Sequence, residues 1–227
     1  MNQAKKTYLN TEKIKNFLLG MLFPTKCIEC ELKDEILCNN CVQKIRIAER
    51  ETENNILAVF DYRDEIIKKA IWELKYHHKK YIGEKLGKLL YEFLVEDISD
   101  LRIEVPGRSI YVIPVPISSK KIKYRGYNQS ISIAKGFCNQ SEPGTFELKD
   151  KIIFKKTNTI PQAKITNRKR RLENVRGVFE IKNKEIVKGR TIVVMDDVTT
   201  TGATINEIIK ILKKSGAKKV IGFAVAH

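Results

Sequence analysis

The sequence has little of several features, and each shortage excludes a class of protein. Its 227 residues include only 12 Gly and 6 Pro, and no low-complexity tract or repeat is present, so the composition is that of a globular domain. No apolar run approaches the ~20 residues that a membrane-spanning helix requires. The 3 histidines, His77, His78 and His227, are not spaced as a metal site, and we assign them no role.

Common catalytic motifs are missing as well. There is no Ser-His-Asp arrangement and no H-E-x-x-H motif, and no glycine-rich loop carries the lysine of a Walker A motif. Acidic residues are also scarce, since 27 Asp and Glu face 43 Lys and Arg, for a net charge of +16. Such a protein attracts polyanions, which include nucleic acid, an acidic membrane surface and phosphorylated small molecules.

One apolar stretch near the N-terminus has the charge and length of a weak signal peptide. Phe17–Phe23 follows Lys13 and Lys15, but no small-residue cleavage site comes after it. We favour an amphipathic helix that packs on the protein, and we expect no membrane span and a cytoplasmic location.

Four of the five cysteines form two C-x-x-C pairs, with seven residues between the pairs. A secreted protein could use them for disulfides, and a single C-x-x-C after a strand can be a redox motif. Two such pairs in close succession are typical of four thiolates around one tetrahedral Zn²⁺. We therefore predict a structural zinc site, without catalytic activity of its own, at Cys27, Cys30, Cys38 and Cys41.

The chain divides into two predicted domains. Residues 1–50 carry the N-terminal helix and the zinc-binding module, and residues 46–55 resemble a charged linker. Residues 51–227 alternate apolar strand patterns with helical ones, which indicates an α/β fold with a mostly parallel twisted sheet and helices on both faces. Strands are expected near 55–60, 110–115, 152–154, 178–181, 191–195 and 220–226, and helices within 63–96, 128–137 and 204–215.

A loop between the expected strand 191–195 and helix 204–215 has the residues of a phosphoribosyl site. It opens at the carboxyl edge of the sheet, where open α/β folds bind ligands. The backbone amides and hydroxyls of Thr199, Thr200, Thr201, Gly202, Ala203 and Thr204 suit a monophosphate at a helix N-terminus. Asp196 and Asp197 suit the hydroxyls of a ribose, with or without Mg²⁺. The alternative is an ordinary turn rich in Asp and Thr.

Ile192–Thr204 resembles the PRPP-binding motif of type I phosphoribosyltransferases at every defining position. From about Leu19 onward, the chain is similar to the ComF family of competence proteins. The segments that carry this likeness are Leu22–Cys27 with the cysteine pairs, Ala70–Tyr76, Pro114–Pro116, Arg125–Gln129, and Gln162 with Arg171 and Asn174–Phe179.

The resemblance implies further site residues. The segment after Pro116 corresponds to the pyrophosphate loop, with Ser118, Ser119, Lys120 and Arg125 as its main ligands and Lys121 also available. A solvated basic turn or a nucleic-acid surface are the alternatives there. Residues 164–176 correspond to a flexible loop that closes over the site or contacts DNA. The candidates for these two roles are Lys123, Tyr124, Tyr127, Asn128, Gln129, Gln162, Arg168 and Arg171.

The resemblance also implies the function. We expect a PRPP-binding ComF-type protein of natural transformation that handles incoming single-stranded DNA, with structural Zn²⁺ and with Mg²⁺ accompanying PRPP. The alternative is an active phosphoribosyltransferase that transfers 5-phosphoribose to a nucleobase or another acceptor and releases pyrophosphate. A third hypothesis is an interaction module that recruits other competence proteins. Enzymatic activity, acceptor and oligomeric state stay open.

Overall fold

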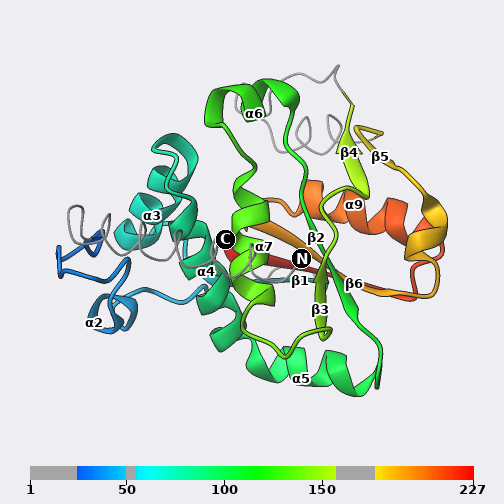
Figure 1. Ribbon diagram of the computed structural model, residues 1–227, viewed down its shortest axis with the longest axis horizontal. Helices are drawn as coiled ribbons and strands as arrows, with labels where there is room; N and C mark the ends of the chain where they lie inside the picture. Colours follow the sequence, from blue (N-terminus) through cyan, green and yellow to red (C-terminus); the bar gives the residue numbers. More distant parts are fainter. Residues whose placement is uncertain (1–24, 50–54, 157–176) are drawn as a thin grey trace, which may run out of the picture. The chain divides into compact units, whose positions relative to one another are not determined.

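A computed structural model of the chain describes residues 25–49, 55–156 and 177–227 (Figure 1). The chain divides into two compact units, Met1–Lys44 and Ile45–His227. The helix expected around Phe17–Phe23 and the middle of the expected linker lie outside the described ranges. Within those ranges, no helix combines the length and apolar character needed to cross a membrane.

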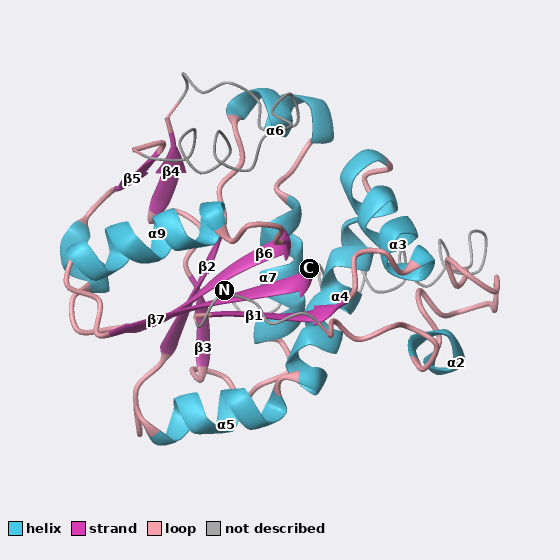
Figure 2. Cartoon of the chain, turned by 180° about the vertical axis from the view of Figure 1, so that it is seen from behind, coloured by secondary structure: helices cyan, strands magenta, loops and turns pink. Residues whose placement is uncertain are grey.

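The larger unit is built on a parallel sheet of five strands in the order β1-β7-β6-β2-β3 (Figure 2). Every neighbouring pair in this sheet is parallel, which confirms the predicted fold class. A separate antiparallel pair is formed by β4 and β5. The bounds are β1 Ile56–Phe60, β2 Ile110–Pro114, β3 Phe146–Leu148, β4 Ile153–Lys155, β5 Phe179–Ile181, β6 Thr191–Val198 and β7 Lys219–Ala226.

The expected helical segment 63–96 contains two helices, in agreement with the one or two that were predicted there. In contrast, α5 was not predicted, and a short helix, α6, occupies the segment expected to be the pyrophosphate loop. Ser118 caps α6 at its start, since its hydroxyl accepts from the N–H of Lys121 at 3.3 Å, and Gly126 ends it with a φ of 72°. The bounds are α2 Asn39–Val42, α3 Glu65–Tyr76, α4 Lys80–Phe93, α5 Val95–Ile103, α6 Ser119–Arg125, α7 Gln129–Cys138, η2 Lys184–Val187 and α9 Ala203–Lys214.

Helices cover both faces of the sheet, as its apolar strands require. On one face, Ile205 and Ile208 of α9 belong to the same apolar cluster as Val194 of β6. On the other face, the ring of Phe137 in α7 lies 5.8 Å from that of Phe223 in β7. Because successive strand residues point to opposite faces, one continuous strand supplies both halves of the core.

Helices α4 and α7 approach each other at the level of their backbones. A Cβ atom on Gly87 would lie 2.0 Å from the carbonyl oxygen of Ile133, and one on Gly136 would lie 2.0 Å from that of Glu84. This contact fixes the position of α7, which begins at the carboxyl edge of the sheet.

Replacing Gly136 by Ala should destabilise the protein strongly. Alanine favours a helix over glycine by about 1 kcal/mol, so the sign of the effect reports the clash and not the helix propensity. We expect overpacking to lower the free energy of unfolding by about 3 kcal/mol and Tm by several degrees. Thermal unfolding measures this, with Lys135→Ala on the exposed side of α7 as the control. An unchanged Tm in Gly136→Ala would contradict the close approach.

Candidate functional site

A cavity of about 170 Å³ lies at the carboxyl edge of the large sheet, the position where open α/β folds bind ligands. It brings together parts of the chain that are far apart in the sequence, from α3, α6, α7, β4, β5, β6 and the start of α9 (Figure 1). Its lining residues are Lys75, Val115, Pro116, Ile117, Lys121, Arg125, Gln129, Lys155, Phe179 and the continuous run 196–205.

The acidic pair and the whole threonine-rich loop line this cavity. We expected both aspartates to follow the strand, but β6 continues through Val198 and therefore includes them. Both aspartates are buried, with Asp196 9% and Asp197 5% exposed. Their carboxylates therefore have fixed positions at the strand end.

Each aspartate has defined partners. Oδ1 of Asp196 accepts hydrogen bonds from Ser130 Oγ at 3.0 Å and from the N–H of Asp197 at 2.9 Å. Oδ1 of Asp197 accepts from the N–H of Val198 at 2.8 Å, and Oδ2 forms an ion pair with Lys75 Nζ at 2.8 Å. Burial, together with the adjacent charge of Asp197, raises the pKa of Asp196 to about 7. Burial opposes the charge of Lys75, but Asp197 outweighs it and raises the pKa of Lys75.

Replacing Asp196 by Asn should stabilise the ligand-free protein at about pH 8 and change its stability little at about pH 4. Because the folded-state pKa of Asp196 lies above its ordinary value, the folded protein holds this proton more tightly than the unfolded chain does. The stability of the wild type therefore falls as the pH rises from about 4 through about 7. Asparagine stays neutral and keeps an oxygen for the hydrogen bonds. Thermal unfolding across this range measures the difference, and a Tm gap that did not widen with pH would contradict it.

The threonine-rich loop is anchored to the neighbouring strand. The N–H of Thr199 donates to the carbonyl of Ala226 at 2.9 Å, and His227 Nε2 donates to the carbonyl of Thr200 at 3.1 Å. Gly202 has a φ of 68° and immediately precedes α9. The first amides of a helix have no partner in a preceding turn, which makes a helix start suitable for an anion. At the start of α9, the N–H of Ala203 donates to Thr201 Oγ1 at 3.4 Å.

Several cations also line the cavity. Burial, with a contribution from Arg125, lowers the pKa of Lys121, and burial, with a contribution from Lys121, lowers that of Lys155. Arg125 is itself buried, donates to Gln129 Oε1 at 2.9 Å and lies 5.5 Å above the ring of Tyr76. Cations held this close repel one another, which suits the cavity to a dense polyanion such as pyrophosphate.

The remaining predicted site residues lie in different surroundings. Ser118, Ser119 and Lys120 begin α6 and are not among the residues that line the cavity. Lys123 and Tyr124 are exposed on α6, with Tyr124 72% exposed.

The residues after α6 are less accessible. Tyr127 is half-buried and donates its hydroxyl to the carbonyl of Leu74. Asn128 is buried and donates to the carbonyl of Val115 at 2.9 Å, and Gln129 is buried against Arg125. Because both side chains are buried, Asn128 and Gln129 are not accessible to DNA. Gln162, Arg168 and Arg171 lie outside the described residues.

Among the cavity residues to which sequence reasoning assigned no role are Lys75, Lys155 and Phe179. Lys75 does lie in the segment Ala70–Tyr76 that carries the family likeness, which is the one signal that could have identified it. Lys155 ends a short apolar strand, and nothing in the local sequence indicates that this residue lines the cavity.

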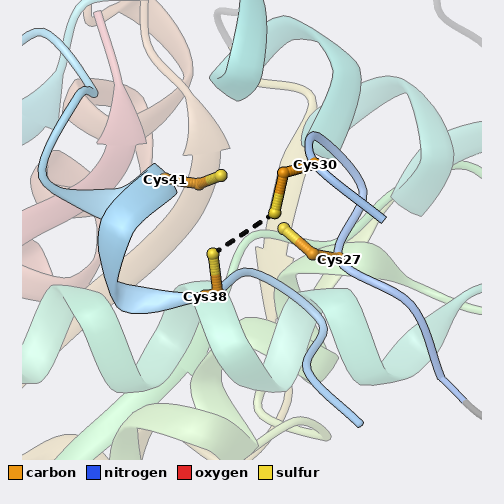
Figure 3. A group of neighbouring side chains, drawn as sticks. All are labelled: Cys27, Cys30, Cys38 and Cys41. Carbon is orange, nitrogen blue, oxygen red and sulfur yellow. Dashed lines mark hydrogen bonds between the residues drawn. The ribbon is translucent and has the colours of Figure 1, made fainter. Parts of the chain in front are cut away.

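The N-terminal unit contains the predicted four-cysteine cluster (Figure 3). The four sulfur atoms lie within 4.8 Å of one another, and those of Cys30 and Cys38 are 3.6 Å apart. Burial by itself raises the pKa of Cys27, but hydrogen bonds from the backbone of Cys30, Cys38 and Glu29 outweigh it and lower the pKa to about 6. Backbone donors aimed at a thiolate and a set of four sulfurs fit Zn²⁺, so the cluster could hold this ion.

The comparisons with known proteins agree with this architecture. Residues 146–227 match the family described as Phosphoribosyl transferase domain. Residues 146–227 therefore resemble a phosphoribosyl transferase domain, and the N-terminal unit carries a four-cysteine cluster.

Two similar proteins align with most of the chain. Competence protein F of Haemophilus influenzae is 24% identical over 191 residues, which are 84% of this chain and 78% of that protein. DNA utilization protein YhgH of Escherichia coli O157:H7 is 27% identical over 86% of this chain and 81% of its own length. These homologues confirm the resemblance to the ComF family.

Shorter or more distant similarities concern enzymes. Adenine phosphoribosyltransferase of Mycoplasmopsis agalactiae is 38% identical over 90 residues, 39% of this chain and 52% of that protein. Among solved structures, the allosteric regulatory enzyme of purine biosynthesis aligns with a TM-score of 0.40 and 20% identity, over 67% of this chain and 29% of that one. Hypoxanthine-guanine phosphoribosyltransferase of L. donovani aligns with a TM-score of 0.39 and 9% identity, over 64% and 67%.

Proposed function

We propose that the protein binds PRPP in the cavity and acts in natural transformation, where it handles incoming single-stranded DNA in the cytoplasm. One observation carries the ligand assignment: a threonine-rich anion site, a buried acidic pair and a cluster of cations line the same cavity. PRPP has a monophosphate, a ribose diol and a pyrophosphate, in this order along the molecule. Few other metabolites require these three environments together.

Each part of the ligand has a place in the proposal. The loop 199–204 holds the 5-phosphate with its backbone amides and hydroxyls. Asp196 and Asp197 accept hydrogen bonds from the ribose hydroxyls. Lys121, Arg125 and Lys155 hold the pyrophosphate. Mg²⁺ bound with PRPP would supply further neutralisation of the pyrophosphate charge.

The DNA part of the proposal rests on charge and on the relatives. Competence protein F and DNA utilization protein YhgH are homologues over most of the chain. The net charge of +16 favours a polyanionic partner, and α6 exposes Lys123 beside Tyr124, a pair that suits a phosphate contact and a stacked base. Other competence proteins are further proposed partners.

Two titrations test the proposal. Calorimetric titration of PRPP, with and without Mg²⁺, should give a one-to-one complex, and ribose without phosphates should not bind measurably. Binding of a single-stranded oligonucleotide should weaken steeply as the salt concentration rises, because phosphate contacts release counterions. Absence of PRPP binding would refute the ligand assignment, and a DNA affinity that does not change with salt would refute the phosphate-contact surface.

The alternative function is an active phosphoribosyltransferase. The cations that line the cavity favour it, since they would stabilise pyrophosphate as it leaves. Such a transfer needs positioning and charge neutralisation more than acid-base groups. Release of pyrophosphate from PRPP in the presence of a nucleobase would support this alternative. Bound PRPP that stays intact with all common bases would favour binding without turnover.

A further inference from the structure

A lysine to which the sequence assigned no role occupies a fixed position beside the acidic pair. Lys75 lies in the last turn of α3, and its Nζ atom is 2.8 Å from Oδ2 of Asp197. Both side chains are largely shielded from solvent, with Lys75 18% and Asp197 7% exposed. An exposed ion pair holds its partners loosely, but a shielded one with this short distance holds both groups in one arrangement.

The helix that carries Lys75 is held at both of its ends. At the start, the side chain of Asp64 accepts from the N–H groups of Ile66 and Ile67 at 2.9 and 3.1 Å. Before Lys75, the carbonyl of Leu74 accepts the hydroxyl of Tyr127. Lys75 therefore projects from a helix end that is itself tied into the segment next to the cavity.

The ring of the next residue, Tyr76, lies under the guanidinium of Arg125, which also lines the cavity. The residues on both sides of Lys75 thus contact the segment 125–127, which begins with the cavity residue Arg125. This arrangement places the ammonium group with a precision that a free surface lysine does not have.

The charge of Lys75 does what a divalent cation would do at the same carboxylate. Two adjacent buried carboxylates repel each other, and a neighbouring cation compensates this repulsion. Oδ1 of Asp197 is bound to the N–H of Val198, and Oδ2 is bound to Lys75. A metal ion that coordinates Oδ2 would have to displace the ammonium group.

We infer that Lys75 is a positioning residue that replaces a divalent cation at the acidic pair, so that the ribose 5-phosphate part of the ligand binds without a metal bridge to Asp197. The part of this inference that concerns the sugar rests on the proposed function. The part that concerns competition between Lys75 and a metal ion does not, because it is a property of the ligand-free protein.

Binding of Mn²⁺ to the ligand-free protein tests the competition directly. In Lys75→Gln both carboxylates are free to coordinate the ion, so we expect it to bind Mn²⁺ at least about tenfold more tightly than the wild type, measured by electron paramagnetic resonance. Lys75→Arg, which keeps the charge, should stay near the wild type. Lys68→Gln, on the exposed side of the same helix, is the matched control and should change nothing. Equal Mn²⁺ affinity in Lys75→Gln and the wild type would overturn the inference.

Titration of ribose 5-phosphate tests the consequence for the ligand, since this molecule lacks the pyrophosphate that binds Mg²⁺ by itself. The wild type should bind it with an affinity that differs less than about threefold between EDTA and excess Mg²⁺. Lys75→Gln should bind it about tenfold more weakly in EDTA and recover in Mg²⁺. A wild type that binds only with Mg²⁺ would overturn the inference even if the variant did not fold. If neither PRPP nor ribose 5-phosphate bound to the wild type or to any variant, the proposed function would fail. The Mn²⁺ result would still decide the role of Lys75.

Discussion

A protein in which Asp196 and Asp197 are both replaced by Asn should bind PRPP about 100-fold more weakly or worse, because two charge-assisted hydrogen bonds are each worth about 1.5–3 kcal/mol. Both side chains are buried and line the cavity, so no neighbouring solvent-exposed group can take over their contacts with the sugar. The amides keep the size of the carboxylates and one acceptor oxygen each. The loss therefore reports charge and hydrogen bonding more than a change of shape, and calorimetric titration with Mg²⁺ measures it.

Binding of inorganic pyrophosphate to the same double variant is a control, because its affinity should not fall with that for PRPP. Its cavity loses two negative charges and keeps the cations Lys75, Lys121, Arg125 and Lys155. Inorganic pyrophosphate should therefore bind as tightly as in the wild type or more tightly, while PRPP binding collapses. A circular dichroism spectrum confirms that the variant is folded. PRPP affinity within tenfold of the wild type would show that the diol is bound elsewhere, and parallel loss of pyrophosphate would point to a damaged cavity.

The part of the site that could be predicted is the part that is continuous in sequence. One strand, one loop and the start of one helix carry Asp196, Asp197 and residues 199–204, and the carboxyl edge of a parallel sheet determines where they point. The expectation failed only in detail, since β6 extends through Val198 and includes the aspartates. Local pattern and the rule for parallel sheets were sufficient there.

The cations of the cavity could be predicted only in part. Arg125 and Lys121 were expected from the family resemblance, in the segment after Pro116. Lys75 and Lys155 come from α3 and β4, and only the folded chain brings them to the same cavity. Their contacts there are long-range in sequence, so the local pattern gave no signal for them.

Local signals for α6 were present, but the family resemblance implied a loop in this segment. Ser118 is a good N-cap residue and Gly126 a good C-terminal one, and together they delimit the helix. The strand β3 was not predicted, because its three residues are too few for an alternating pattern to be distinctive.

The N-terminal unit depends on a different source of stability. In the described part of this unit, residues 25–44, the buried apolar side chains are those of Leu37 and three of the four clustered cysteines. Full burial of one leucine contributes about 1.5–3 kcal/mol, which is far below the entropy lost on ordering about twenty residues. A structural zinc ion contributes about 10–16 kcal/mol in small zinc-binding peptides. The metal, and not an apolar core, is therefore expected to hold this unit together.

Removal of zinc should unfold residues 25–44. The protein should contain one Zn²⁺ per chain by elemental analysis, and a strong chelator or Cys41→Ser should release it. The amides of Cys27, Ile28 and Val42, which are hydrogen-bonded within the unit, should then exchange with solvent at rates near those of an unfolded chain. Cys138→Ser is the matched control, because this cysteine lies in α7, outside the cluster, and its loss should leave the zinc content unchanged. Protected amides in the metal-free protein would show that the unit folds without the ion, since a sulfur cluster that only tolerated zinc would leave the backbone hydrogen bonds intact.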